Sequence, residues 1–186
     1  HYEKIFRIKP QLLAADMHPD YLASRYARQR TTEENLPLVE VQHHHAHIVS
    51  CMADNGLKQD EPVIGLAFDG TGYGTDGAIW GGEVLLANWE KFERLYHLEY
   101  MPLPGGEAAV RKPARMALSL VLQAGLDPED FPFPFHQSLD MEELAAVQNQ
   151  VRTGFNTPKT SSVRRLFDGV AALVGLHQAI SYEAQN

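Results

Sequence analysis

Cysteine is nearly missing from this chain, since Cys51 is the one cysteine among 186 residues. A single cysteine cannot close an intrachain disulfide, and it excludes a zinc site built from several cysteines. The scarcity of cysteine favours a reducing compartment, and we expect the protein in the cytoplasm. We expect Cys51 itself to be a packed side chain rather than a reactive thiol.

Long apolar runs and an excess of positive charge are also missing. No stretch approaches the roughly 20 apolar residues of a membrane span, and the first residues, HYEKIFRIKP, lack the apolar core of a signal peptide. Lysine and arginine number 16 against 24 aspartate and glutamate residues, a formal net charge of -8. Because nonspecific binding to nucleic acid needs a basic face, we expect neither a membrane nor a nucleic acid as partner.

The first third of the chain alternates between extended and helical patterns. Apolar residues at 10–17 and 36–42 predict two strands, and the segment 20–30 between them has near-helical spacing. Strand, helix and strand with short links predict a right-handed crossover, and hence a parallel pair. A second helix is expected over 44–55, with Gly56 as its stop.

The rest of the chain predicts an antiparallel meander followed by helices. We expect strands at 63–69, 78–89 and 92–101, with a bulge at Gly81-Gly82 in the second. A helix is expected to follow Pro104-Gly105-Gly106, with Pro113 in its first turn or at a kink. After it we expect a loop at 127–138 and two more helices, at 140–154 and 161–175. Asp140 would cap the first of these two. The fold class is therefore α/β, a mixed sheet with flanking helices. We expect residues 1–125 to form a first lobe and 126–186 to begin a second, helical part.

A cluster of histidines stands out in VQHHHAHIVS, residues 41–50, where four of five successive positions are histidine. Positions i and i+4 share one face of a helix, so His43 and His47 can offer two imidazoles to one metal. Asp54 lies on the same face but about 16 Å further along the axis, so a third ligand must come from elsewhere. The alternative is a partly exposed histidine cluster at a helix start. We expect His44 and His45 to pack or to form hydrogen bonds.

A glycine-rich stretch, FDGTGYGTDG at 68–77, follows the predicted strand 63–69. Its glycines can turn backbone amides toward an anion, and Thr71 adds a hydroxyl donor. Asp69 and Asp76 can hold a cation or a water. The alternative is a tight turn without a ligand. Further on, Arg111 and Arg115 can meet a phosphate, although we expect them to be solvated.

Four motifs together carry a resemblance to a known family. VQHHHAH, AFDGTGYGTDGAIWGGE, MPLPGGEAAVRKPARMAL and SSVRRLFDGVAALVG occur here in this order. They resemble the C-terminal carbamoyl-transfer domain of the HypF family of [NiFe]-hydrogenase maturation, which is related to TsaD-type proteins. The resemblance covers nearly all of the chain and implies an incomplete lobe of an actin/Hsp70/sugar-kinase-like (ASKHA) fold.

The resemblance also implies roles for particular residues. His43 and His47 would bind a divalent metal (zinc, iron or magnesium) together with an aspartate from the distal lobe. The implied phosphate- and metal-lining residues are Asp69, Gly70, Thr71 and Gly72. Asp168 would contact a ribose, and Glu183 would lie near a nucleotide-contacting turn. Two residues depart from the family pattern, because Arg164 and Ala184 stand where glycine is usual.

The implied reaction transfers a carbamoyl group. Upstream domains would make carbamoyl-adenylate from carbamoyl phosphate and ATP, and the acceptor would be the C-terminal cysteine of the partner HypE. We expect this chain to be a fragment that is inactive alone and able to self-associate. The alternatives are a TsaD-like transfer to tRNA adenosine and a non-catalytic scaffold that binds metal or nucleotide.

Overall fold

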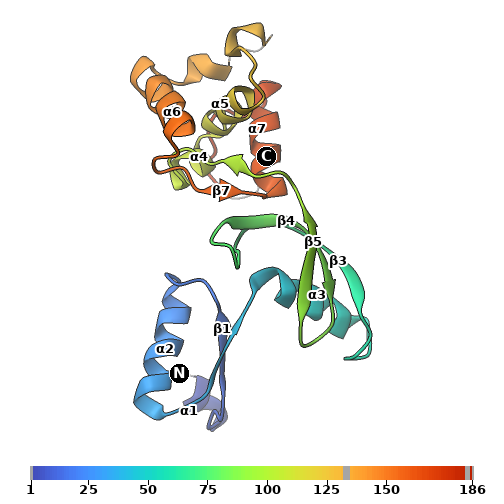
Figure 1. Cartoon of the computed structure of the whole chain (residues 1–186). Coiled ribbons are helices and arrows are strands. Elements are labelled where there is room, and N and C mark those ends of the chain that lie inside the picture. Colours follow the sequence, from blue (N-terminus) through green and yellow to red (C-terminus); the bar gives the residue numbers. More distant parts are fainter. Residues whose placement is uncertain (1, 132–134, 183–184, 186) are drawn as a thin grey trace.

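The computed structural model describes residues 2–131, 135–182 and 185. Figure 1 shows a βαβ unit at the lower left, an antiparallel meander with one helix beside it, and a group of helices at the top. Helices and strands alternate in the first part, and the strands form a 2-stranded sheet and a 5-stranded sheet. The predicted α/β class, with a mixed sheet and flanking helices, is confirmed.

The βαβ unit forms as its sequence predicts. After a short helix α1 (Tyr2–Phe6), strand β1 (Leu13–Asp16) pairs in parallel with β2 (Leu38–Val41). Helix α2 (Leu22–Glu34) makes the crossover between them. Because parallel strands end at the same edge, Asp16 lies opposite Val41, next to the start of the following helix.

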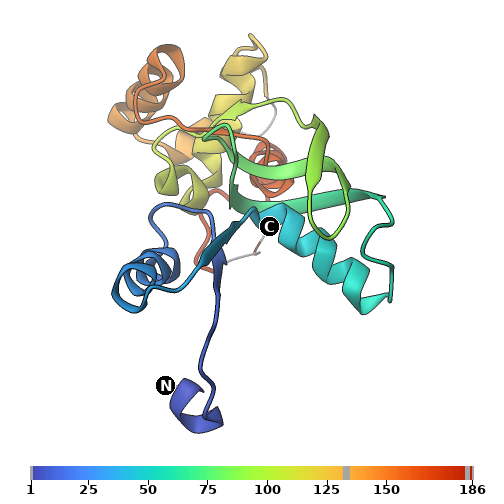
Figure 2. The same cartoon turned by 60° about the horizontal axis from the view of Figure 1, so that its bottom comes forward.

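Helix α3 (His43–Asp54) begins directly after β2. Gln42 is its N-cap, and the side-chain oxygen of Gln42 accepts a hydrogen bond from the backbone amide of His45 at 3.0 Å. Ile48 and Met52 of this helix are buried against the meander, with Trp80 and Leu85 in the same apolar cluster. Figure 2 shows α3 lying along the meander. The helix is therefore fixed by its cap at one end and by its packing along one face.

The meander consists of β3 (Val63–Tyr73), β4 (Ile79–Ala87) and β5 (Phe92–His97), paired antiparallel in sequence order. Strand β3 is longer than predicted, because it continues through the glycine-rich stretch and reverses only after Tyr73. The hydrogen bond from the amide of Gly77 to the carbonyl of Gly74 closes that turn.

A bulge in β3 shapes the part of the sheet that carries Asp69. Phe68 lies opposite Gly82 and Gly72 opposite Trp80, so residues 69–71 of β3 face Gly81 alone. We predicted the bulge at Gly81-Gly82 in β4, and this was wrong: the extra residues belong to β3. A Cβ atom at Gly81 would lie 2.4 Å from the carbonyl oxygen of Asp69, so glycine at 81 makes room for the bulged backbone.

We expect Gly81→Ala to destabilise the protein by about 1–3 kcal/mol, because backbone rather than a flexible side chain blocks the added methyl group. The free energy of urea-induced unfolding measures this effect. Gly77→Ala in the turn is the comparison. Its Cβ would meet nothing within 4 Å, so its loss of stability reports only the strain of a φ of +80°, whereas that of Gly81→Ala reports the steric clash. A Gly81→Ala variant as stable as the unaltered chain would contradict this account of the bulge.

The last part of the chain is mainly helical. Its elements are β6 (Met101–Pro102), α4 (Glu107–Arg111), α5 (Pro113–Gln123), the 3-10 helices η1 (Pro128–Asp130) and η2 (Phe135–Ser138), α6 (Met141–Thr153), β7 (Lys159–Thr160) and α7 (Val163–Leu173). Pro113 starts a new helix instead of kinking a continuous one, so the helix predicted after residue 104 is two helices. Asp140 caps α6 as predicted.

Arg115 on α5 is buried, not solvated as we expected. Its guanidinium donates to Glu143 at 2.8 Å and to Gln150 at 2.9 Å, and both partners belong to α6. This pairing joins α5 to α6, and it leaves Arg115 unavailable to a ligand. Within the described residues, no helix is both long and apolar enough to span a membrane.

Candidate metal centre and adjoining cleft

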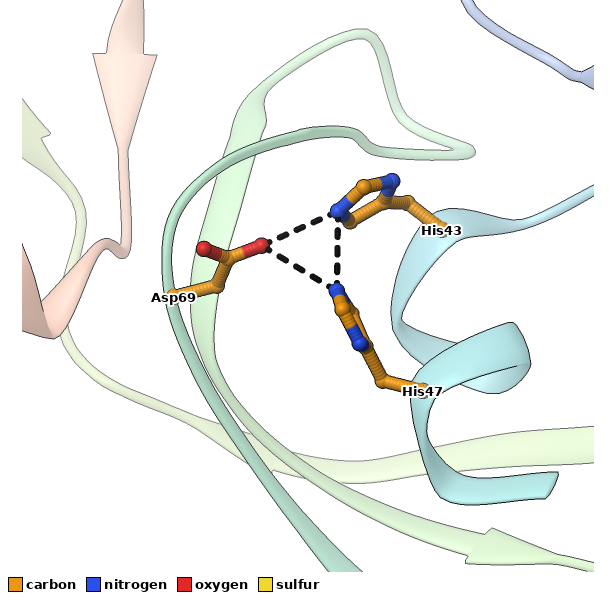
Figure 3. Close-up of side chains that lie close together, drawn as sticks. All are labelled: His43, His47 and Asp69. Carbon is orange, nitrogen blue, oxygen red and sulfur yellow. Dashed lines mark hydrogen bonds and ion pairs between the residues drawn. The ribbon is translucent and has the colours of Figure 1, made fainter. Parts of the chain in front are cut away.

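Three side chains that lie far apart in the sequence converge at one point (Figure 3). His43 and His47 come from α3, and Asp69 comes from the bulge of β3. The Nε2 atom of His43 lies 3.0 Å from Oδ2 of Asp69 and 3.1 Å from Nε2 of His47, and Nε2 of His47 lies 3.6 Å from the same oxygen. One donor atom from each residue falls within 4.8 Å of the others. These three residues are called the triad below.

The ring of His43 is oriented from the opposite side by Asp16. Nδ1 of His43 lies 2.9 Å from Oδ2 of Asp16, at the end of β1. When Nδ1 carries the proton and donates to Asp16, the lone pair on Nε2 faces Asp69 and His47. A carboxylate behind a histidine is the usual support of a metal-binding imidazole. The βαβ unit thus contributes to the centre although none of the triad belongs to its strands.

Asp69 is held by the backbone and by the cap of α7. Its Oδ1 accepts a hydrogen bond from the amide of Gly70 at 2.6 Å, which leaves Oδ2 toward the histidines. The hydroxyl of Ser162, the N-cap residue of α7, donates to the carbonyl oxygen of Asp69 at 2.7 Å. The bulge is therefore attached to the start of α7.

A buried charged network lies behind that attachment. The carboxylate of Glu83 is fully buried and accepts from the amides of Gly81 and Gly82, at 3.1 and 3.2 Å, and from the hydroxyl of Ser161. Arg94 donates to it at 2.5 Å. Burial alone would raise the pKa of Glu83, but the hydrogen bonds from Arg94, Ser161 and the two amides together hold that pKa below its ordinary value. Glu83 is thus an ionised anchor between β4 and the segment that leads into α7.

The other two histidines of the cluster pack and form hydrogen bonds, as predicted. His45 is buried, with Nε2 2.7 Å from the carbonyl oxygen of Asn88. His44 is completely buried, and its Nδ1 lies 3.2 Å from the side-chain nitrogen of Gln42. Burial lowers the pKa of His44 to about 4, so this ring is neutral at neutral pH. A Cβ at Gly72 would lie 2.4 Å from the His44 ring, so Gly72 makes room for that ring.

A cleft of about 640 Å³ adjoins the triad at Asp69. Gly70 and Thr71 of the bulge line it, and Arg111 and Arg164 contribute positive charge. His18 and Tyr21 also line it, with their rings stacked at 4.0 Å between centroids. The side chain of Arg164 passes close to Gly70, where a Cβ would lie 3.0 Å from its Cδ. The departure from glycine at position 164 therefore adds a cation to this cleft.

Several residues singled out in the sequence lie elsewhere. Asp168 is buried in α7 and pairs with Arg165 at 2.9 Å, and it does not line the cleft. Glu183 and Ala184 lie outside the described residues. Cys51 is exposed, so the expectation of a packed thiol was wrong. Asp54 is exposed at the far end of α3, away from the triad as expected.

Sequence reasoning missed Asp16 and Ser162 as supports of the centre. A signal for Asp16 was present, because it ends one strand of a predicted parallel pair and α3 begins just after the other. Groups at the carboxyl ends of parallel strands meet at one edge of a sheet. For Ser162 there was only a helix-cap pattern, which says nothing about the distant carbonyl that its hydroxyl contacts.

Comparison with known proteins identifies the family of the chain. A family model described as "Carbamoyltransferase, Kae1-like Domain, second subdomain" matches residues 65–186, and another, "HypF Kae1-like domain", matches residues 1–54. The chain is 41% identical to carbamoyltransferase HypF2 of Cupriavidus necator over 186 residues, which are 100% of this chain and 22% of that protein.

Solved structures agree as well. A crystal structure of full-length HypF in the phosphate- and nucleotide-bound form matches with a TM-score of 0.87 and 46% identity, over 99% of this chain and 28% of that one. HypF of T. kodakarensis matches with a TM-score of 0.83 and 38% identity, over 99% of this chain and 25% of that one. The chain thus spans about a quarter of the length of these relatives. Its sequence and its fold together show that the chain belongs to the HypF family of carbamoyltransferases.

Proposed function

We propose that the triad holds a divalent metal within a carbamoyl-transfer site, and that the cleft beside it binds the phosphate and nucleotide part of carbamoyl-adenylate. The observation that carries this proposal is the convergence of His43, His47 and Asp69, with one donor atom each within 4.8 Å. The distal-lobe aspartate expected from the resemblance would be a further ligand. Asp69 supplies one carboxylate within this chain.

The donor set suits some metals better than others. Two imidazole nitrogens and one carboxylate oxygen are ligands typical of zinc or of non-haem iron. Magnesium prefers oxygen ligands throughout. Of the three metals that the resemblance allows, zinc and iron therefore fit better. The support that Asp16 gives to His43 agrees with such a site.

The bound metal would act as a Lewis acid that stabilises negative charge developing on the carbamoyl oxygen. The chain's own residues would bind and orient the rest of the substrate. Thr71 offers a hydroxyl to a phosphate, Gly70 allows the phosphate to approach the backbone, and Arg111 and Arg164 compensate its charge. A related HypF has been crystallised in a phosphate- and nucleotide-bound form, which supports this assignment of the cleft. Asp168 and Glu183 stay sequence-based predictions of nucleotide contacts.

In the longer protein, we propose that carbamoyl phosphate and ATP give carbamoyl-adenylate in other domains, and that the acceptor is the C-terminal cysteine of HypE. Attack of the thiolate on the carbamoyl carbon would form the thiocarbamate and release AMP. The acidic balance of the chain, with a net charge of -8, does not favour the alternative acceptor, tRNA.

Metal content of the purified chain tests the first step of this proposal. After removal of any tag and incubation with zinc or ferrous iron, mass spectrometry should find metal in the unaltered chain and little in His47→Ala. His47 is 60% exposed, so its removal should spare the fold. Ser50→Ala, at another exposed position of α3, should retain the metal.

Either of two results would contradict the metal site. Equal metal in the unaltered chain and in His47→Ala would place the ion elsewhere. No metal in any of the three proteins would show that the triad does not suffice to bind one.

A further inference from the structure

The Nε2 atom of His44 is a buried polar atom without a hydrogen-bond partner among the described residues. Its ring is enclosed by Gly72 on one side and lies 6.2 Å from the Trp80 ring between centroids. The carboxylate of Asp69 lies toward Nε2, with Oδ2 at 4.0 Å. That distance is roughly 1 Å longer than a hydrogen bond. An unpaired buried donor or acceptor is rare enough to ask for a reason.

Gln42 decides which nitrogen of His44 carries the proton. The side-chain oxygen of Gln42 accepts from the amide of His45, and its nitrogen donates to the carbonyl oxygen of Tyr73 at 3.2 Å. Both partners are backbone groups with fixed roles, so the orientation of the Gln42 amide is set. Its nitrogen therefore faces Nδ1 of His44 as a donor, and Nδ1 must accept. In the neutral ring the proton then lies on Nε2, which faces Asp69.

We propose that His44 is a positioning residue for Asp69: its Nε2–H group faces the carboxylate and holds Oδ2 in the orientation that completes the triad. This inference rests on the proposed metal site for its functional meaning. A shift of about 1 Å by either side chain would close the contact into a hydrogen bond. The N–H dipole attracts the carboxylate at the present distance as well, because the His44 ring that carries it is fully buried. Gln42, which caps α3, would thus also set the tautomer of His44, which in turn positions the proposed metal ligand Asp69.

The tautomer can be measured without any metal. Nitrogen-15 NMR of the histidine rings in the metal-free 186-residue chain should show His44 protonated on Nε2 and unprotonated on Nδ1. Asp69→Asn should shift the Nε2 resonance of His44 and leave that of His45 unchanged. A proton on Nδ1 of His44, or an Nε2 resonance insensitive to Asp69→Asn, would overturn the proposal.

Metal affinity provides the functional readout. His44→Leu fills the pocket without a donor, and we expect its metal dissociation constant to rise about tenfold to a hundredfold. His44→Gln can place an amide N–H near the position of Nε2, and it should bind metal within about fivefold of the unaltered chain. His45→Leu is the matched control, because His45 is also buried but hydrogen-bonds away from the triad. It should leave the affinity unchanged even if it lowers stability.

The outcomes separate this proposal from the metal site itself. If His44→Leu binds metal as tightly as the unaltered chain, His44 does not position Asp69. If His44→Leu fails to fold by circular dichroism, the tautomer measurement decides in its place. A chain that binds no metal in any form contradicts the proposed function, whereas the NMR result still decides whether His44 faces Asp69 as a donor.

Discussion

Asp69→Ala is expected to weaken metal binding by about a hundredfold or more, because even the loss of a residue that only supports a metal ligand costs tenfold to a hundredfold. The substitution removes the one carboxylate of the triad and also a hydrogen-bonding partner of His43. Competition with a chelator measures the dissociation constant. In the full-length family protein that contains this domain, carbamoyl transfer to the proposed acceptor thiol should fall to near background.

Asp54→Ala is the control for that experiment. Asp54 is an exposed carboxylate at the end of α3, on the same helix as His43 and His47. Its removal should change neither metal affinity nor transfer. If Asp69→Ala and Asp54→Ala behave alike, Asp69 is not a ligand, and the ion would have to depend on groups outside the triad.

Glu83→Gln should produce the largest loss of stability, about 3–5 kcal/mol, because it removes the fully buried carboxylate partner of Arg94 and leaves only the more exposed Asp76, at 3.1 Å, to balance its charge. The amide nitrogen of glutamine would also oppose existing donors: the Gly81 and Gly82 amides and the Ser161 hydroxyl if it takes the place of Oε1, or Nε of Arg94 if it takes the place of Oε2. Urea unfolding at neutral pH measures the difference. Glu93→Gln, an exposed position on β5, is the matched control and should change little.

The same comparison has an expected pH dependence. Since the pKa of Glu83 is lower in the folded protein than in the unfolded chain, its ionised form contributes stability that is fully present above the unfolded value. That contribution is lost as the pH falls through the lowered folded value. The stability difference between the unaltered chain and Glu83→Gln should therefore shrink in acid. A difference that stays constant down to acid pH would show that the charge of Glu83 is not what stabilises the network.

Local patterns in the sequence predicted much of this fold. The βαβ unit, α3 and the cap of α6 follow from apolar spacing and from cap residues, and His43 and His47 share a face because four residues separate them. These features depend on neighbours within a few positions. They are the part of the structure that propensity and periodicity can determine.

Contacts between segments that are distant in sequence could not be predicted in this way. The position of Asp69 beside the histidines depends on a strand that continues through glycines and bulges opposite Gly81, and a glycine-rich run by itself is equally typical of a loop. Arg115 is buried because it pairs with two side chains of α6, which lie 28 and 35 residues further along the chain. No local pattern reports such partners.

The triad draws on both regions that the family models match separately, since His43 and His47 precede residue 54 and Asp69 follows residue 65. An ion held by all three would act as a clamp across the connection between α3 and β3. Its affinity and the docking of these two segments are then thermodynamically linked, because any motion that separates them removes a ligand. Bound metal would therefore restrict motion between α3 and β3, and a looser contact between these two segments would weaken metal binding.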